Sequence, residues 1–332
     1  MIVSRTPFRV SLFGGGSDYP LHLQENCGAI LGGAIDKYCF LTLRQLTQDF
    51  GSRYRIRYTH SESAASIDGI QHPAVRAVLT EYGVKEATEI NHSSDLPARS
   101  GIGSSSAFIV GLLAALKFQS DGGINSTQIA REAIDFEQKI LKEVVGYQDT
   151  ILASLGSFGL IEFQKGNLNY TYSPITNHEY IEELSKNFLL IRTGEEQRVA
   201  STIATEQVKK MKMHAKDLNE LADIARSMFS EMKNETANER SIAKLLNYSW
   251  EVKKRQSNVI SNRNIDNLVS LSFSKGAIGA KLLGAGHSGF LLVVVPTIRQ
   301  EKFLQEMSNH KIVKFGWSKT GVLVERSFEY GI

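Results

Sequence analysis

The order of hydrophobic and polar residues changes twice along the first half of the chain. Short runs rich in β-branched and aromatic residues, separated by glycine turns, predict strands at 2–4, 8–13, 38–44 and 53–58. Apolar residues at helical spacing then predict helices near 74–82, 104–118 and 127–144, before residues 157–163 return to a strand pattern. We therefore expect a β-rich layer that is followed by helices packed against it.

A second set of elements follows residue 170. Strand patterns lie at 188–191, 289–295 and 321–325, and helical patterns lie at 197–231, 239–257, 263–275 and 299–308. The chain of 332 residues is long enough for two cores. We predict an α+β protein with an N-terminal domain of residues 1–170 and a C-terminal domain of residues 171–332.

Composition narrows the class of protein. The chain is 42% hydrophobic, but its longest apolar run, residues 107–116, is too short to span a membrane, and the N-terminus lacks the features of a signal peptide. A cytoplasmic location is expected. The net charge of +3 gives no support to nucleic-acid binding. Cys27 and Cys39 lack the spacing of a metal site or a disulfide framework.

The segment Pro97–Ser106 is rich in glycine and serine and leads directly into an apolar helix. Glycines let a backbone approach a ligand closely, serines add hydroxyl groups, and a helix N-terminus directs N–H groups and a positive dipole end at an anion. The alternative is a polar linker, but the helix is apolar almost all round, which predicts that its start is buried. We expect a site for nucleotide phosphate.

Two carboxylates between residues 127 and 153 have the pattern of functional groups. Glu137 interrupts the apolar face of the predicted helix 127–144, where it needs either an ordinary ion-pair partner or a divalent metal ion. Asp149 opens another apolar segment, where it is either a helix N-cap or a catalytic group. A phosphoryl transferase needs one carboxylate for a metal ion and another for the acceptor hydroxyl.

Two common nucleotide-binding motifs are excluded. Residues 284–289 match G-x-G-x-x-G, but the clear strand at 290–295 follows the glycines, whereas the dinucleotide motif requires a helix there. No segment matches G-x-x-x-x-G-K-[ST]. The expected phosphate loop is therefore not of the Walker type.

Three segments, in this order, resemble the motifs of the GHMP kinase superfamily, which includes galactokinase, homoserine kinase and mevalonate kinase. They are Thr6–Tyr19, Pro97–Ser106 and Lys281–Phe290. The triple glycine of Phe13–Pro20 is most similar to the D-glycero-D-manno-heptose 7-phosphate kinases. The resemblance implies an N-terminal domain like the second domain of ribosomal protein S5 and a ferredoxin-like C-terminal domain. It also implies ATP-dependent phosphorylation of the anomeric hydroxyl of a heptose 7-phosphate, which gives the 1,7-bisphosphate for bacterial surface-sugar synthesis.

The resemblance also implies roles for individual residues. Asp149 would accept or orient the acceptor proton, Arg9 would stabilise the developing charge, and Ser105 and Glu137 would bind Mg²⁺. The residues expected around the ATP phosphates are Pro97, Arg99, Ser100, Gly101, Ile102, Gly103, Ser104, Ser105 and Ser106. The residues expected around the sugar are Gly15, Gly16, Ser17, Asp18, Tyr147, Arg198 and Gly286.

Some features depart from the family pattern or leave alternatives open. Arg99 stands where relatives usually carry a small residue, and it either contacts nucleotide phosphate or forms a nearby salt bridge. His287 and Ser288 replace a pair of glycines. Arg198 is either a ligand of the 7-phosphate or a solvated helix-surface residue. The alternative functions are a kinase for a fucose-like or galactose-like sugar and a non-catalytic sugar- or nucleotide-binding regulator. A homodimer is a possible assembly.

Overall fold

The computed structural model describes residues 1–47, 51–98, 100–166, 168–194, 205–206, 208 and 210–327. Its strands form two sheets. The larger sheet has the order β12-β1-β2-β5-β3-β4, and β6 adds to it by pairing with both β2 and β7. The smaller sheet has the order β11-β8-β10-β9. The sequence-based expectation of an α+β fold is confirmed.

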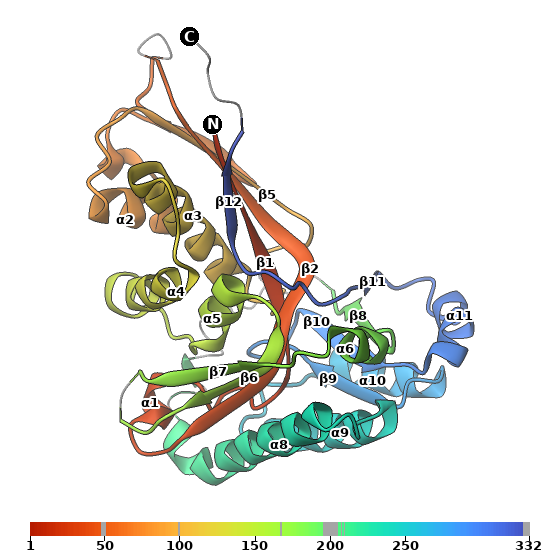
Figure 1. The fold of residues 1–332 in the computed structure, drawn as a ribbon. Coiled ribbons are helices and arrows are strands. Elements are labelled where there is room, and N and C mark those ends of the chain that lie inside the picture. Colours follow the sequence, from red (N-terminus) through yellow and green to blue (C-terminus); the bar gives the residue numbers. More distant parts are fainter. Residues whose placement is uncertain are drawn as a thin grey trace.

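The strands of the larger sheet have the following bounds: β1 Ile2–Phe13, β2 Gly28–Gln45, β3 Tyr54–Arg57, β4 Ser61–Ala64, β5 Thr88–Ser94, β6 Phe158–Phe163, β7 Tyr170–Pro174 and β12 Leu323–Arg326. Those of the smaller sheet are β8 Phe188–Arg192, β9 Gly279–Leu282, β10 Phe290–Val294 and β11 Ile312–Lys314. The strand β12 pairs antiparallel with β1, so the end of the described chain returns to the larger sheet (Figure 1). The division near residue 170 stays a prediction.

The helices surround these two sheets. They are α1 Pro20–Leu23, α2 Pro73–Glu81, α3 Ser104–Asp121, α4 Ser126–Asp135, α5 Gln148–Leu155, α6 His178–Ser185, α8 Ala215–Lys233, α9 Glu239–Arg255, α10 Arg263–Ser274 and α11 Thr297–Glu306. The helices α2 to α5 lie together on one side of the larger sheet, whereas α8 and α9 run side by side below it (Figure 1). The helix α9 packs against both α8 and β9.

The helix α3 lies at the centre of the first layer. Every residue from Ser106 to Leu116 is buried, because the helix packs against β1, β2, α4 and α5. The prediction that the start of this helix is buried holds from Ser106 onward but is wrong for the first two residues, because Ser104 is partly exposed and Ser105 is exposed. From Ser106 onward the helix is fixed in place by packing on several sides.

The predicted helix 127–144 is wrong in its second half. The α-helix ends at Asp135, and Phe136–Ile140 form a π-helical turn. A π turn widens the helical repeat, so Ile140, the last residue of this turn and expected on the buried face, is 41% exposed. Glu137 lies within this turn and keeps its buried position.

Candidate active site

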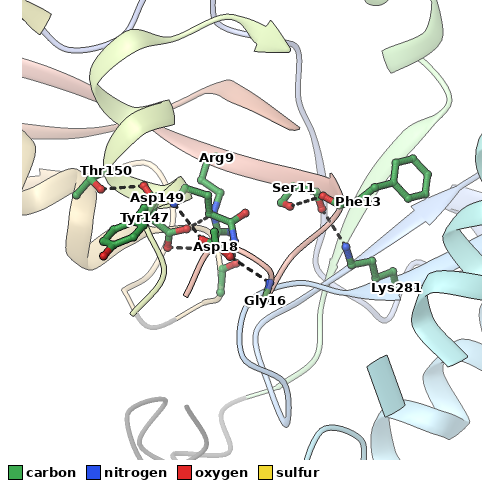
Figure 2. A network of polar contacts seen from close by, with 12 residues as sticks. Arg9, Ser11, Phe13, Gly16, Asp18, Tyr147, Asp149, Thr150 and Lys281 are labelled. Atoms are coloured by element: carbon green, nitrogen blue, oxygen red, sulfur yellow. Dashed lines mark hydrogen bonds and ion pairs between the residues drawn. The ribbon is translucent and has the colours of Figure 1, made fainter. Parts of the chain in front are cut away.

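Arg9 and Asp149 form a bidentate ion pair between β1 and α5 (Figure 2). The Arg9 Nε donates to Asp149 Oδ1 at 2.7 Å, and Nη2 donates to Oδ2 at 2.8 Å. The third Arg9 donor, Nη1, reaches the carbonyl oxygen of Gly101 at 2.6 Å. The Arg9 side chain is 7% exposed and that of Asp149 is 21% exposed. The guanidinium thus fixes the carboxylate in one orientation while leaving part of it accessible.

Asp149 lies in the first turn of α5 and is not the N-cap. The N-cap is Tyr147, whose side chain makes no capping hydrogen bond. A carboxylate in the first turn is stabilised by the helix dipole, which adds to the attraction of Arg9. The N-cap alternative for Asp149 is therefore wrong, and its carboxylate faces β1 instead.

Asp18 joins the loop after β1 to the start of α5. Its Oδ1 accepts hydrogen bonds from Gly16 N and Gln148 Nε2, at 3.1 and 3.2 Å, and its Oδ2 accepts one from Gln148 N at 3.0 Å. The side chain is completely buried, and burial raises its pKa. A Cβ at Gly146 would lie 2.1 Å from Asp18 Oδ2, so this approach requires glycine. Asp18 therefore positions the element that carries Asp149.

The other residues predicted to contact the sugar lie at varied depths. Ser17 is buried, and its hydroxyl bonds with the backbone N–H and C=O of Ala29. Gly15, Gly16 and Tyr147 are partly exposed, and Gly286 is buried in the loop between β9 and β10. Arg198 and Arg99 lie outside the described residues.

The glycine-rich segment and the start of α3 form one side of the site. Gly103 is the N-cap of α3 and makes no side-chain capping bond, so no side chain of the cap covers this end of the helix. Ser100 and Ile102 are buried, whereas Pro97 and Ser105 are exposed. Arg9 holds the segment twice, because its backbone N–H also donates to Ile102 O at 3.0 Å. The arrangement presents a helix N-terminus beside the ion pair, as an anion site requires.

The loop 284–289 packs directly on this segment. Gly101 has φ +75°, and a Cβ there would lie 2.8 Å from Leu283 O. A Cβ at Gly284 would lie 2.6 Å from Gly101 Cα. His287, in the same loop, has φ +69°, a conformation that costs free energy for a residue other than glycine. The backbone of His287 therefore places strain beside the site.

Glu137 is buried opposite the start of α3. It is 1% exposed, and its Oε1 has no hydrogen-bond partner. Burial raises its pKa to about 8; a hydrogen bond from Ser106 lowers the pKa, and the charges of Glu143 and Asp149 raise it. Among the described residues, no cation lies within ion-pair distance of Glu137, which argues against the ion-pair alternative.

A divalent cation fits this carboxylate. Its unpartnered buried oxygen lacks the positive charge that would offset its burial, and hard cations favour carboxylate and hydroxyl oxygens. Within the part of the chain that the structure describes, no group of three or more His, Cys, Asp or Glu could hold a metal ion. Mg²⁺ fits a site with so few protein ligands, because it usually keeps several water ligands and binds substrate phosphates.

Two buried lysines near this site were missed by the sequence analysis. Lys281 donates to the carbonyl oxygens of Ser11 and Leu12, at 3.3 and 2.8 Å (Figure 2). Lys253, on α9, donates to the carbonyl oxygen of Gly284. The only signal for Lys281 was its place in the third motif, and Lys253 stands in a Lys-Lys-Arg run typical of an exposed helix end.

Comparison with known proteins identifies similar kinases. The family model of the GHMP kinases N terminal domain matches residues 70–157. A D-glycero-alpha-D-manno-heptose 7-phosphate kinase from Campylobacter jejuni is 28% identical over 335 residues, covering 97% of this chain and 98% of that protein. Residues 70–157 thus match the GHMP kinase family, and the similarity to the heptose 7-phosphate kinase extends along almost the whole chain. The matches support an ATP-dependent phosphotransferase of the GHMP kinase type.

Further GHMP kinases match over the full length. A galactokinase from Pyrococcus furiosus is 24% identical, with 100% of this chain and 99% of that protein covered. The structure of a D-glycero-D-manno-heptose 1-phosphate kinase from Bacteroides thetaiotaomicron has a TM-score of 0.77 at 22% identity, covering 99% of this chain and 100% of that one. That likeness shows the GHMP kinase fold. Across the described residues, none of the helices is long and apolar enough to cross a membrane.

Proposed function

We propose that this GHMP kinase transfers the γ-phosphoryl group of ATP to the anomeric hydroxyl of D-glycero-D-manno-heptose 7-phosphate. The product would be the 1,7-bisphosphate, an intermediate for nucleotide-activated heptose in bacterial surface polysaccharide. The bidentate Arg9–Asp149 pair beside the N-terminus of α3 is the observation that supports the chemistry. The similarity to the Campylobacter jejuni kinase along almost the whole chain supports the acceptor.

The nucleotide phosphates would lie along residues 97–106. Backbone N–H groups and the dipole of α3 attract negative charge at this point. Pro97 and Ser105 are exposed to an incoming ligand, and the buried Ser100 and Ile102 anchor the segment from behind. Arg99 is predicted to lie among these groups, where it either contacts phosphate or pairs with a neighbouring acid.

Asp149 would act on the acceptor hydroxyl. As that oxygen forms its bond to the γ-phosphorus, the bond from phosphorus to the ADP oxygen breaks, and the hydroxyl proton passes to an oxygen of Asp149. Arg9 holds that carboxylate by two hydrogen bonds and places positive charge beside the transferred phosphoryl group. Both groups are set before substrate binds, so little reorganisation accompanies the reaction.

Glu137 and Ser105 would hold Mg²⁺. The bound ion would neutralise charge on the phosphate oxygens. Glu137 supplies the carboxylate, and the hydroxyl of the buried Ser106 hydrogen-bonds to Glu137 and keeps it directed at the start of α3. The exposed Ser105 neighbours Ser106 in the first turn of α3.

The sugar would lie between the loop after β1 and the loop 284–289. Gly15, Gly16, Tyr147 and Gly286 are proposed to line this space. Ser17 and Asp18 are predicted ligands as well, but the polar atoms of Ser17 and Asp18 already bond to the protein, so we expect them to act mainly by holding the loop. Arg198 is proposed to bind the 7-phosphate, and an Arg198→Ala variant should raise the KM for that substrate alone.

A kinase for a free sugar is the second candidate, because a galactokinase and a fucokinase also match. A non-catalytic regulator is disfavoured by the intact ion pair and the intact Glu137. The test is ADP release from ATP with heptose 7-phosphate, heptose 1-phosphate, heptose, fucose and galactose offered in parallel. Heptose 7-phosphate should give the highest kcat/KM. Turnover of a sugar without phosphate, and of no sugar phosphate, would refute the proposed acceptor.

A further inference from the structure

Lys253 carries a buried positive charge that the proposed reaction has not yet used. Its side chain comes from α9 and the residue is 9% exposed. Its ammonium donates one hydrogen bond, to the carbonyl oxygen of Gly284, although an ammonium has three donors. Among the described residues, no carboxylate lies within 4.0 Å of it. A buried charge with so few partners is costly unless something else binds it.

The charged groups around Lys253 do not neutralise it. Arg9 on β1 is a cation, and burial together with the charges of Lys253 and Arg9 lowers the pKa of Lys281 on β9 well below its ordinary value. Asp18 after β1 is an acid whose oxygens already accept three N–H bonds. Asp149 is engaged by Arg9 in the bidentate pair. Burial and the charge of Arg9 lower the pKa of Lys253 to about 8, while Asp18 raises it.

Lys281 differs from Lys253 in its contacts. It uses two donors on carbonyl oxygens at the end of β1, so it fastens that strand to the smaller sheet. Lys253 makes a single hydrogen bond to the loop 284–289, at the carbonyl oxygen of Gly284. Of these two lysines, Lys253 therefore keeps more donors for a ligand.

The position of Lys253 is next to the phosphate-transfer groups. Gly284, which accepts its hydrogen bond, packs backbone to backbone on Gly101. Gly101 in turn accepts the third hydrogen bond of Arg9. The Lys253 ammonium is thus fixed to the loop 284–289 and the Arg9 guanidinium to the segment 97–106, at the point where these two touch. We refer to the loop and the segment as the two glycine loops. Because Arg9 is already paired with Asp149, Lys253 is the group at this contact with donors left for an anion.

We propose that Lys253 binds a phosphoryl group of a substrate at the contact between the two glycine loops. The ligand class is a phosphate monoester or the terminal phosphate of a nucleoside triphosphate. As an extension of the proposed kinase function, the two sources are the phosphate of the sugar acceptor and the γ-phosphate of ATP. Lys253 contacts this group directly, and Lys281 holds β1 in place behind it.

The test compares Lys253→Met and Lys253→Arg with Lys254→Met. Lys254 is the neighbouring residue on α9, where it pairs with Glu251 at 2.7 Å on the surface, so its substitution removes the same charge outside the site. Calorimetric titrations would use a non-hydrolysable ATP analogue, ADP, heptose 7-phosphate and unphosphorylated heptose. The Tm of each free variant is measured in parallel.

Lys253→Met should weaken binding of one phosphate-bearing ligand by roughly tenfold or more, and leave its partner without that phosphate unchanged. Lys253→Arg should retain most of the affinity, and Lys254→Met all of it. The Tm of free Lys253→Met should be equal to or above that of the wild type, because an uncompensated charge is removed. A lower Tm with unchanged affinities would mean that Lys253 only braces the loop, and would overturn the proposal.

The same experiment separates this proposal from the proposed acceptor. If the wild type binds no heptose 7-phosphate, the acceptor assignment fails, yet the pair of nucleotides still tests Lys253. If the wild type binds heptose 7-phosphate and Lys253→Met binds both phosphate-bearing ligands within twofold of it, the Lys253 proposal fails alone. If Lys253→Met does not fold, Lys253→Arg is compared with Lys253→Gln. The quantity compared is the ratio of the affinity for the phosphorylated ligand to that for the unphosphorylated ligand. A ratio that equals that of Lys253→Gln would refute a role for the charge.

Discussion

Replacement of Asp149 by asparagine tests the central ion pair with the smallest change of shape. The amide keeps one oxygen, which can accept one of the two hydrogen bonds from Arg9, but it turns an NH₂ group toward the other donor. The Arg9 guanidinium then retains the Gly101 carbonyl and one amide oxygen as partners, and it loses its counter-charge.

Two magnitudes follow from this geometry. The loss of one charge-assisted hydrogen bond should lower the free energy of unfolding by about 2 kcal/mol. Partial exposure of Asp149, at 21%, lets water replace some of that bond and keeps the cost moderate. Loss of the proton acceptor should lower kcat by roughly 10²-fold to 10⁴-fold. The ATP site should survive, because Arg9 still holds the segment 101–103 through its backbone.

The assay measures kcat by ADP release, ATP affinity by calorimetry and stability by urea unfolding. Asp135→Asn is the control, because Asp135 forms an exposed pair with Lys139 at 2.9 Å and should change none of these values appreciably. A kcat for Asp149→Asn within tenfold of the wild type would refute the assigned role. A large loss of ATP affinity would show that the ion pair serves the nucleotide site instead.

Three further substitutions test other parts of the structure. Gly101→Ala should lower ATP affinity by at least tenfold, because its methyl group would clash with the facing loop 284–289. Gly122→Ala is the control, because Gly122 also has positive φ but lies in open space. It should lower the free energy of unfolding by only about 1 kcal/mol and leave activity unchanged. Glu137→Gln should raise the Mg²⁺ concentration for half-maximal activity at least tenfold, and an unchanged Mg²⁺ titration would exclude it as a ligand. Burial raises the pKa of Glu89, but a hydrogen bond and charge from Arg44 and other arginines bring it below its ordinary value of 4.5. This carboxylate therefore stabilises the fold above pH 4.5 and loses its contribution as the pH falls further, so Glu89→Gln should cost about 1–2 kcal/mol at pH 7 and converge with the wild type in acid. Urea unfolding from pH 7 to pH 3 would show this, and a gap that stays constant would contradict it.

The sequence predicted the elements whose local pattern agrees with their final environment. The apolar run after Ser106 could only be a buried helix, and α3 confirms it. The first half of β2 was missed, since Gly28, Gly32 and Gly33 are weak strand formers and that segment is held by pairing with β6. The break in the helix at Phe136 was also missed, because a π turn leaves the apolar spacing before it intact.

The residues of the candidate site also fall into two groups, those that the sequence could reveal and those that it could not. Glu137 and Asp149 could be found because a carboxylate among apolar residues is unusual wherever it occurs. Their partners are 31 and 140 positions away in the sequence, at Ser106 and Arg9, so only the fold or a family resemblance can supply them. Lys253 gave no sequence signal, because its neighbours Lys254 and Arg255 make the run look like an exposed helix end.

The position of the new phosphate on the sugar tests the account most directly. The protein is incubated with ATP, Mg²⁺ and heptose 7-phosphate, and the product is measured by two-dimensional ¹H–³¹P NMR. The account predicts a second sugar phosphorus signal that correlates with the anomeric proton, with the original 7-phosphate signal retained. A new phosphorus signal that correlates with any other sugar proton, or inorganic phosphate alone, would contradict it.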